Sequence, residues 1–135
     1  MCDEFSFTIR VYIEDTDAGG IVYYVNYLKF MERARTELLR TLGINKPATL
    51  EEGNLLVVAS VNVKYLKSAL LDDELQVTAK ILKLARSYFL IEQKVMRGEE
   101  CLAGGEIKVA CVDQETMKPC VFPKRIQGLL GQAPI

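Results

Sequence analysis

The chain has 135 residues, half of them hydrophobic, with 17 basic and 18 acidic side chains and a net charge of −1. This length supports one domain with a hydrophobic core and is too short for two, so we expect a single domain over residues 1–135. The nearly balanced charge offers no attraction for a phosphate backbone, which argues against nucleic acid as a partner. The absence of histidine excludes an imidazole base, a Ser-His-Asp triad and a His-ligated metal.

The sequence shows no sign of export or membrane insertion. Residues 1–5 are acidic where a signal peptide is basic, and apolar runs such as 55–59 fall far short of the roughly 20 residues that cross a bilayer. We therefore expect a cytoplasmic protein with no membrane span. The four cysteines are Cys2, Cys101, Cys111 and Cys120. None is spaced as C-x-x-C, so the pattern predicts reduced, mostly buried thiols.

The first predicted element is a strand over residues 5–13. Apolar and polar side chains alternate from Phe5 to Ile13, which is the pattern of a half-buried strand. The Ala-Gly-Gly turn at residues 18–20 ends it, because glycine adopts backbone angles that other residues resist.

An amphipathic helix of about four turns is predicted from Tyr27 to Leu42, beginning at Asn26 or a neighbour. Its apolar positions recur every three or four residues, and Gly43 and Pro47 mark its end. These apolar positions are Tyr27, Phe30, Met31, Ala34, Leu38 and Leu42.

The remaining chain returns to a period of two and predicts four strands, at 57–65, 75–81, 87–97 and 105–113. The first should direct one set of side chains to the core, namely Val57, Ala59, Val61, Val63 and Tyr65. The apolar phase slips after Ile81, which predicts a bulge or the end of contact with the core. A further short helix is predicted within residues 123–130.

Gly104 and Gly105 lie inside a strand pattern. They indicate either a bulge, which we favour, or a close approach of the backbone to a ligand. Short polar links between the strands favour hairpins, so the sheet should be largely antiparallel. One strand, one long helix and four strands predict an α+β fold in which the helix buries its apolar stripe against one sheet face.

The most specific segment sets carboxylates on a glycine turn immediately before the helix. YIEDTDAGGIVY at residues 12–23, with Asn26-Tyr27 and FMERARTE at 30–37, resembles the hotdog-fold acyl-CoA thioesterases of the 4-hydroxybenzoyl-CoA thioesterase group. The branch it resembles most is the bacterial thioesterases associated with the Tol-Pal system. The resemblance covers nearly the whole chain, because the segment 111–113 and the prolines at 119 and 123 also match the usual ending of that branch.

The resemblance implies a hotdog fold, in which a five-stranded antiparallel sheet wraps around one long central helix. It also implies protomers paired edge to edge as a homodimer or homotetramer, with active sites at the subunit interface. The substrate would be acyl-CoA or an acyl group on acyl carrier protein, with no cofactor and no metal. The resemblance assigns the catalytic carboxylate to Asp17 and polarisation of the thioester to the backbone N–H of Tyr24. It places Gly20 and Ile21 against the substrate.

This assignment is physically reasonable. The first turn of a helix has N–H groups without internal partners and carries roughly half a positive charge. A donor there that stabilises the developing oxyanion is worth about 3 kcal/mol. Asp17 would act as a general base on water or attack directly to form an anhydride, and both routes stay open.

Other assignments are less determined. For the phosphates of coenzyme A the candidates are Lys83, Arg86 and Ser87, although basic residues at a strand turn more commonly guard a solvated edge. Asp15 is expected only to cap a turn. Tyr24 stands where the Tol-Pal branch commonly has histidine, which leaves the acyl group, aliphatic or aromatic, undecided.

Two other classes of function remain open. One is a non-catalytic protein that binds acyl-CoA or acyl carrier protein on the same fold. The other is a Mg²⁺ site for phosphate chemistry built from Glu14, Asp15 and Asp17, which lacks a phosphate loop. A chelator would separate the last from a carboxylate thioesterase, which should keep its activity.

Overall fold

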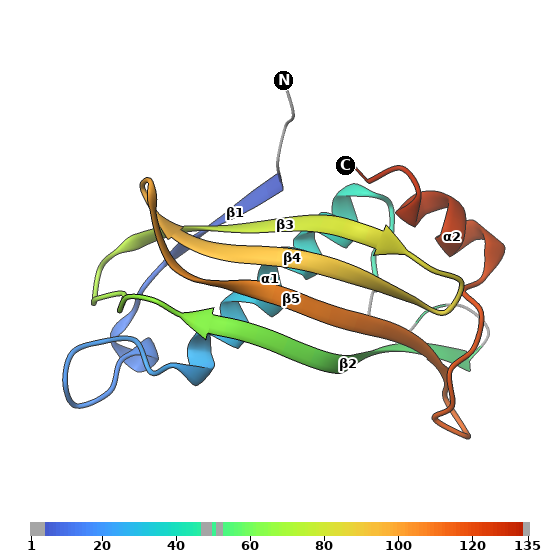
Figure 1. Cartoon of the computed structure of the whole chain (residues 1–135), viewed down its shortest axis with the longest axis horizontal. Coiled ribbons are helices and arrows are strands. Elements are labelled where there is room, and N and C mark those ends of the chain that lie inside the picture. Colours follow the sequence, from blue (N-terminus) through green and yellow to red (C-terminus); the bar gives the residue numbers. More distant parts are fainter. Residues whose placement is uncertain (1–4, 47–49, 51–52, 134–135) are drawn as a thin grey trace.

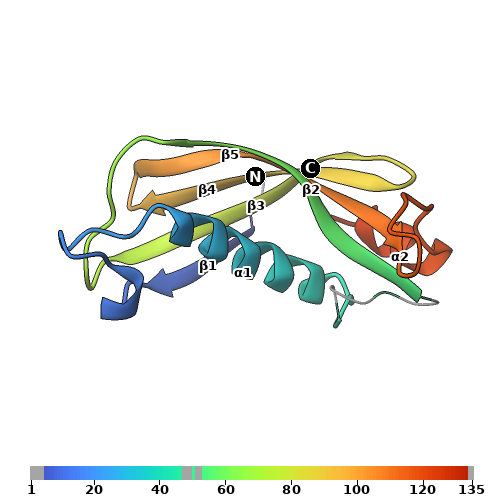
Figure 2. The ribbon, with the colours of Figure 1, turned by 90° about the horizontal axis from the view of Figure 1, so that it is seen from below.

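The computed structural model describes residues 5–46, 50 and 53–133, and shows a five-stranded antiparallel sheet with a long helix across one face (Figures 1 and 2). The sheet order is β1-β3-β4-β5-β2. The elements are β1 (Phe5–Arg10), the 3₁₀ turn η1 (Ile13–Asp15), α1 (Val25–Thr41), β2 (Asn54–Tyr65), β3 (Glu74–Leu84), β4 (Tyr88–Arg97), β5 (Glu100–Asp113) and α2 (Lys124–Leu130). The expected α+β hotdog fold and the short terminal helix are confirmed. No helix among these residues is long and apolar enough to cross a membrane.

Helix α1 packs its apolar stripe against β1, β3 and β4. Phe30, Met31 and Ala34 are fully buried in the core, together with Phe89 and Ile91 of β4. Burying a side chain of Phe or Met size contributes about 2 kcal/mol, so this stripe fixes the position of the helix on the sheet. The helix begins two residues earlier than Tyr27, at Val25.

The helix leaves the edge of the sheet at β2 uncovered. Val58 and Val61 face the helix side of the sheet but are 46% and 45% exposed. The register between β2 and β5 shifts between Val58 and Ser60, so the bulge at Ala59 changes which residues face the helix. The prediction that Val57 and Ala59 share the core face with Val61 is therefore wrong.

Two other irregularities of the sheet test the sequence predictions. The phase slip after Ile81 is confirmed as a bulge, because the register of β3 on β4 shifts there. The bulge predicted at Gly104 and Gly105 is wrong, since both pair in register with β4, and the shift lies beside Leu102. Gly105 is required for another reason: a Cβ there would overlap the backbone carbonyl of Asn62 on β2.

The first strand ends earlier than predicted. β1 stops at Arg10, and Ile13 lies in the 3₁₀ turn with 76% of its surface exposed. The cause is local, because the Tyr12 N–H donates to the Asp15 carboxylate at 2.9 Å and bends the chain away from β3. This bond also confirms the expectation that Asp15 caps a turn.

Candidate active site at the start of the long helix

Asp17 lies at the tip of a tight hairpin. Its N–H donates to the carbonyl of Ile21 at 2.9 Å, and Thr16 bridges Val22. The Asp17 side chain is exposed, and its Oδ1 accepts from the Gly19 N–H at 2.9 Å. Gly20 has φ +80°, which explains the need for glycine at this turn. The hairpin therefore holds the Asp17 carboxylate at a defined place on the surface.

The start of α1 follows directly after this hairpin. Tyr24 is the N-cap residue, and no acceptor among the described residues binds its N–H. Asn26 donates its side-chain amide to the Asp15 carbonyl at 2.8 Å, which ties the first helical turn to the hairpin. The structure thus places the start of α1 directly after the hairpin that carries Asp17, Gly20 and Ile21, with a Tyr24 N–H that no described residue accepts.

The loop at residues 66–73 holds this assembly from the other side. The Ala69 N–H donates to the Tyr27 hydroxyl at 2.8 Å, and the Ala69 carbonyl accepts from the Val22 N–H at 2.9 Å. One residue of the loop therefore fixes both the hairpin and the helix.

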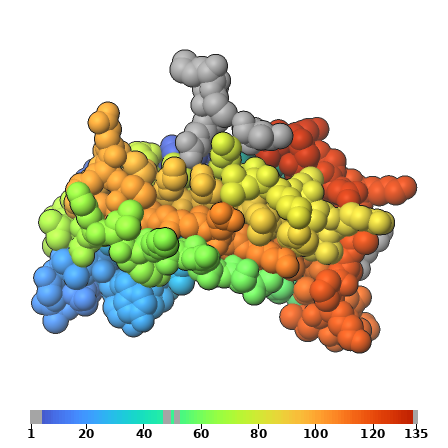
Figure 3. Space-filling view, in the orientation of Figure 1, coloured from blue at the N-terminus to red at the C-terminus, as the bar shows by residue number. Residues whose placement is uncertain are grey.

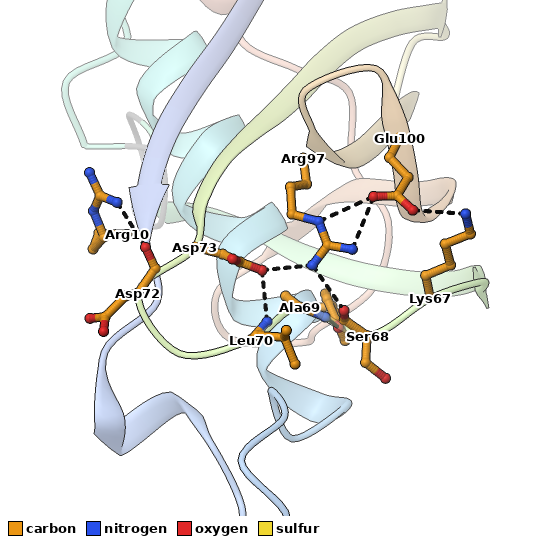
Figure 4. A network of polar contacts seen from close by, with 10 residues as sticks. Arg10, Lys67, Ser68, Ala69, Leu70, Asp72, Asp73, Arg97 and Glu100 are labelled. Atoms are coloured by element: carbon orange, nitrogen blue, oxygen red, sulfur yellow. Dashed lines mark hydrogen bonds and ion pairs between the residues drawn. The ribbon is translucent and has the colours of Figure 1, made fainter.

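Arg97 fastens that loop (Figure 4). Its guanidinium reaches Asp73 at 2.7 Å and Glu100 at 3.0 Å, and Glu100 also pairs with Lys67 at 2.8 Å. Burial disfavours the charged form of Asp73, but the bond from the Leu70 N–H and the pairing with Arg97 outweigh it and lower its pKa. Sequence reasoning missed this network, because Asp73 is 24 residues from Arg97 and Lys67 is 33 residues from Glu100, with no pattern that links them.

A groove runs between α1 and β2. It has a section of about 550 Å³ and a smaller one of about 230 Å³. Both are lined by Glu32, Arg35 and Val58, and the smaller begins at Val25, the residue after Tyr24. Neither section is lined by Asp17 or Tyr24 themselves.

Arg35 supplies the half-buried charge of this groove. Its Nη1 donates to the Oε1 of Gln93 at 3.3 Å, and Gln93 is fully buried, with its Nε2 donating to the Met31 carbonyl at 2.8 Å. Burial lowers the pKa of Arg35, and the nearby charge of Glu32 works in the opposite direction. In the larger section the apolar part of the wall includes Leu39, Leu56, Phe89 and Val109, and the remaining polar part is formed by Thr36, Arg40, Asn45 and Lys46.

Tyrosines gather around the helix start. The Tyr24 ring centroid lies 5.7 Å from that of Tyr65, and the Tyr27 centroid lies 5.6 Å from the same ring. Burial, followed by the neighbouring tyrosines, raises the pKa of Tyr65. Tyr24 is 58% exposed, so its expected contact with an acyl group stays a prediction.

The predicted phosphate-binding residues lie elsewhere. Lys83, Arg86 and Ser87 surround the β3–β4 turn, at the opposite end of the sheet from the start of α1 (Figure 1). The 11 residues of β3 span about 35 Å between these ends. One protomer therefore does not bring these residues to Asp17 and Tyr24.

The structure adds two residues to this basic group. The ring of Tyr88 lies 5.5 Å from the Lys83 ammonium and 4.4 Å from that of Lys108. Lys83 is the main cause of the lowered pKa of Tyr88. Lys108 was missed because it lies on β5, and only the pairing of β4 with β5 brings it here.

The acidic residues of the hairpin do not form a metal site in the described part of the chain. Asp15 turns to the Tyr12 N–H, and Asp17 turns to Gly19. No group of three or more metal-ligating side chains is found among residues 5–46, 50 and 53–133. This geometry gives no support to the magnesium alternative.

Comparison with known proteins gives a consistent assignment. A family model described as the thioesterase-like superfamily matches residues 11–130. The acyl-CoA thioesterase YbgC of Haemophilus influenzae is 48% identical over 125 residues, which cover 92% of each chain. The acyl-CoA thioester hydrolase YbgC of Escherichia coli is 40% identical over 123 residues, covering 90% of this chain and 92% of that protein.

Solved structures agree. A probable thioesterase from Bartonella henselae, 31% identical, aligns with a TM-score of 0.81 over 89% of this chain and 99% of its own. A 1,4-dihydroxy-2-naphthoyl-CoA thioesterase from Synechocystis aligns with a TM-score of 0.86 over 96% of both chains, and at 20% identity shows the fold alone. The sequence match and the architecture together show that this chain belongs to the thioesterase-like superfamily.

Proposed function

We propose that this protein hydrolyses acyl-CoA thioesters to a carboxylic acid and free CoA. The observation that supports this most is the Tyr24 N–H at the start of α1, which bonds to no described residue and follows the hairpin that presents Asp17. A thioester oxygen against that N–H gains stabilisation as negative charge develops on it. The activities named for the relatives at 48% and 40% identity point to the same reaction.

Asp17 completes the chemistry in one of two ways. As a general base it takes a proton from water, whose oxygen attacks the carbonyl carbon and expels the CoA thiolate. As a nucleophile it forms a mixed anhydride, which water then hydrolyses. Both routes require the ionised carboxylate and use no histidine.

The active enzyme is proposed to be a homodimer, or a homotetramer of such pairs, joined through β2. This strand of 12 residues is an edge of the sheet, and it forms a long border of the molecule (Figure 3). A two-fold axis that pairs β2 with its copy makes one continuous antiparallel sheet and reverses the partner's direction. The β3–β4 turn of the partner subunit then moves toward the Asp17 end of the first.

This arrangement assigns roles to both ends of the molecule. The acyl group enters the groove beside Val25, and the thioester carbonyl contacts the Tyr24 N–H. The CoA phosphates bind the basic residues Lys83, Arg86 and Lys108 near the β3–β4 turn of the partner subunit. Ser87 provides a hydroxyl at the same turn.

The decisive variant is Asp17→Asn, which keeps size but removes charge and basicity. We expect kcat to fall by about a hundredfold or more in a thiol-release assay with a panel of acyl-CoA substrates.

Glu14→Gln is the matched control, because it removes a neighbouring exposed carboxylate and should leave the rate unchanged. Wild-type turnover in a folded Asp17→Asn protein would refute the assignment. Binding of acyl-CoA with no thiol release from any substrate would instead support the non-catalytic alternative. Loss of activity on chelation would support the magnesium one.

A further inference from the structure

Two cysteines face each other at the opposite end of the protomer from Asp17 and Tyr24. After β5 the chain turns back on itself: the Asp113 N–H donates to the Lys118 carbonyl, and the Cys120 N–H donates to the Cys111 carbonyl, both at 2.9 Å. This pairing places Cys111 and Cys120 directly opposite each other, with their sulfur atoms 3.5 Å apart. The nine-residue spacing gave no sign of this in the sequence.

The backbone geometry suits a covalent bond between them. Directly opposite residues of antiparallel strands have Cα atoms about 4.5–5.5 Å apart. Disulfides span Cα separations of roughly 4.4–6.8 Å, so the sulfur atoms need only close the remaining gap by side-chain rotation.

We propose that Cys111 and Cys120 form an oxidative modification site, at which a low-molecular-weight disulfide converts the two thiols into an intramolecular disulfide. The two sulfur atoms differ in access. Cys111 is fully buried, whereas Cys120 is partly exposed and its thiol lies 3.3 Å from Oδ1 of Asn54. Cys120 is therefore the thiol that meets the oxidant first.

The reaction balances in two exchange steps. The Cys120 thiolate attacks one sulfur of the external disulfide, forms a mixed disulfide and releases one small thiol. Cys111 then loses its proton to water and attacks the Cys120 sulfur, which releases the second small thiol. Two protein thiols are oxidised and one external disulfide is reduced.

The rate of the second step should depend on pH. Burial, followed by the hydrogen bond with Cys120, raises the pKa of the Cys111 thiol to about 12. The fraction of Cys111 thiolate therefore rises tenfold for each pH unit up to that value. Closure of the disulfide should accelerate across neutral and alkaline pH without reaching a plateau.

The new bond would also reinforce the basic end of the molecule. The Cys111 N–H donates to the Ser87 carbonyl at 2.7 Å, and the Phe122 N–H donates to the Arg86 carbonyl at 2.9 Å. The segment around the two cysteines thus holds the β3–β4 turn. Any effect on KM for acyl-CoA rests on the proposed function, but formation of the disulfide does not.

The test uses the full-length, reduced protein incubated with glutathione disulfide, then quenched with acid and mapped by mass spectrometry. We expect the loss of two hydrogen atoms, a peptide link between Cys111 and Cys120, and full reversal by dithiothreitol. Cys111→Ser should stop at a glutathione adduct on Cys120. Cys101→Ser is the control and should still form the link.

A chain that keeps both thiols alkylatable in excess oxidant, or a disulfide mapped to another pair, overturns the proposal. The same holds for a Cys120→Ser protein that still forms a disulfide at Cys111. Because the readout is mass alone, these outcomes leave the proposed thioesterase activity unaffected.

Discussion

At the scale of single residues, Asp73 and Arg97 show how charge positions the reaction centre without taking part in it. Asp73 accepts from the Leu70 N–H at 2.9 Å and pairs with Arg97. The loop that they fix contains Ala69, which bonds both Val22 and Tyr27. Loss of the pair should therefore loosen the hairpin and the helix start together.

Asp73→Asn is expected to destabilise the fold by about 1 kcal/mol, as for a partly exposed charge pair. The folded-state pKa of Asp73 is below its ordinary value of 3.8, so its contribution is fully present above that value. It is lost as the pH falls through the lowered pKa. Thermal unfolding should show that the free energies of unfolding of variant and wild type differ by a constant amount from neutral pH to about pH 5. The two free energies should converge only in strong acid.

Asp72→Asn provides the control. Asp72 is exposed with φ 71°, a conformation that asparagine accepts. The free energy of unfolding of the Asp72→Asn protein should therefore match that of the wild type at every pH. If Asp73→Asn unfolded like the control, Asp73 would have no positioning role.

At the scale of elements, the groove between α1 and β2 depends on both the helix and the bulge in β2. The bulge at Ala59 directs Val58 into the groove, where it lines both sections. A larger side chain there would block passage between the two sections while leaving the Tyr24 end open.

We expect Val58→Phe to lower kcat/KM for long-chain acyl-CoA at least tenfold while largely sparing short-chain substrates, because only long chains reach past residue 58. Leu82 is another exposed apolar residue and lies outside the groove, so Leu82→Phe should change kcat/KM for neither long-chain nor short-chain substrates. An equal loss for all chain lengths would show that the acyl group does not extend along this groove. The measurement is a chain-length series in the thiol-release assay.

The same elements show what the sequence could predict. The stripe from Tyr27 to Leu38 predicted the helix, because its packing depends on a period visible within the segment itself. The phase slip at Ile81 located a bulge for the same reason. The bulge at Ala59 escaped, since a run of small apolar residues has no polar position to show the change of phase.

The candidate site divides in the same way. Asp17 and Tyr24 are close in sequence, and their local assembly could be predicted from the motif. Lys108 and the Arg97 network could not, because only strand pairing and loop packing bring them into place. The outline of the groove was missed as well, since it depends on where the helix crosses the sheet.

At the scale of the whole molecule, the two halves of the proposed site lie at opposite ends of one sheet (Figure 1). Activity should therefore require assembly through β2. Val61→Asp places a charge on the uncovered edge strand and should yield monomers that have lost most turnover. Light scattering measures the oligomeric state and the thiol-release assay measures turnover, both on one sample.

Leu82→Asp is the matched control, because Leu82 is 44% exposed but lies away from β2. It should remain assembled and active. A wild-type monomer with full turnover would show that one chain is sufficient.

The distance of about 35 Å along β3 has one more consequence for a two-fold dimer. Each reaction centre would use Asp17 of one subunit and the basic residues of the other. Two inactive variants could therefore form an active centre together. Unfolding and refolding an equal mixture of Asp17→Asn and Arg86→Ala should restore about a quarter of the wild-type rate, since half of the pairs are hybrids with one undamaged centre.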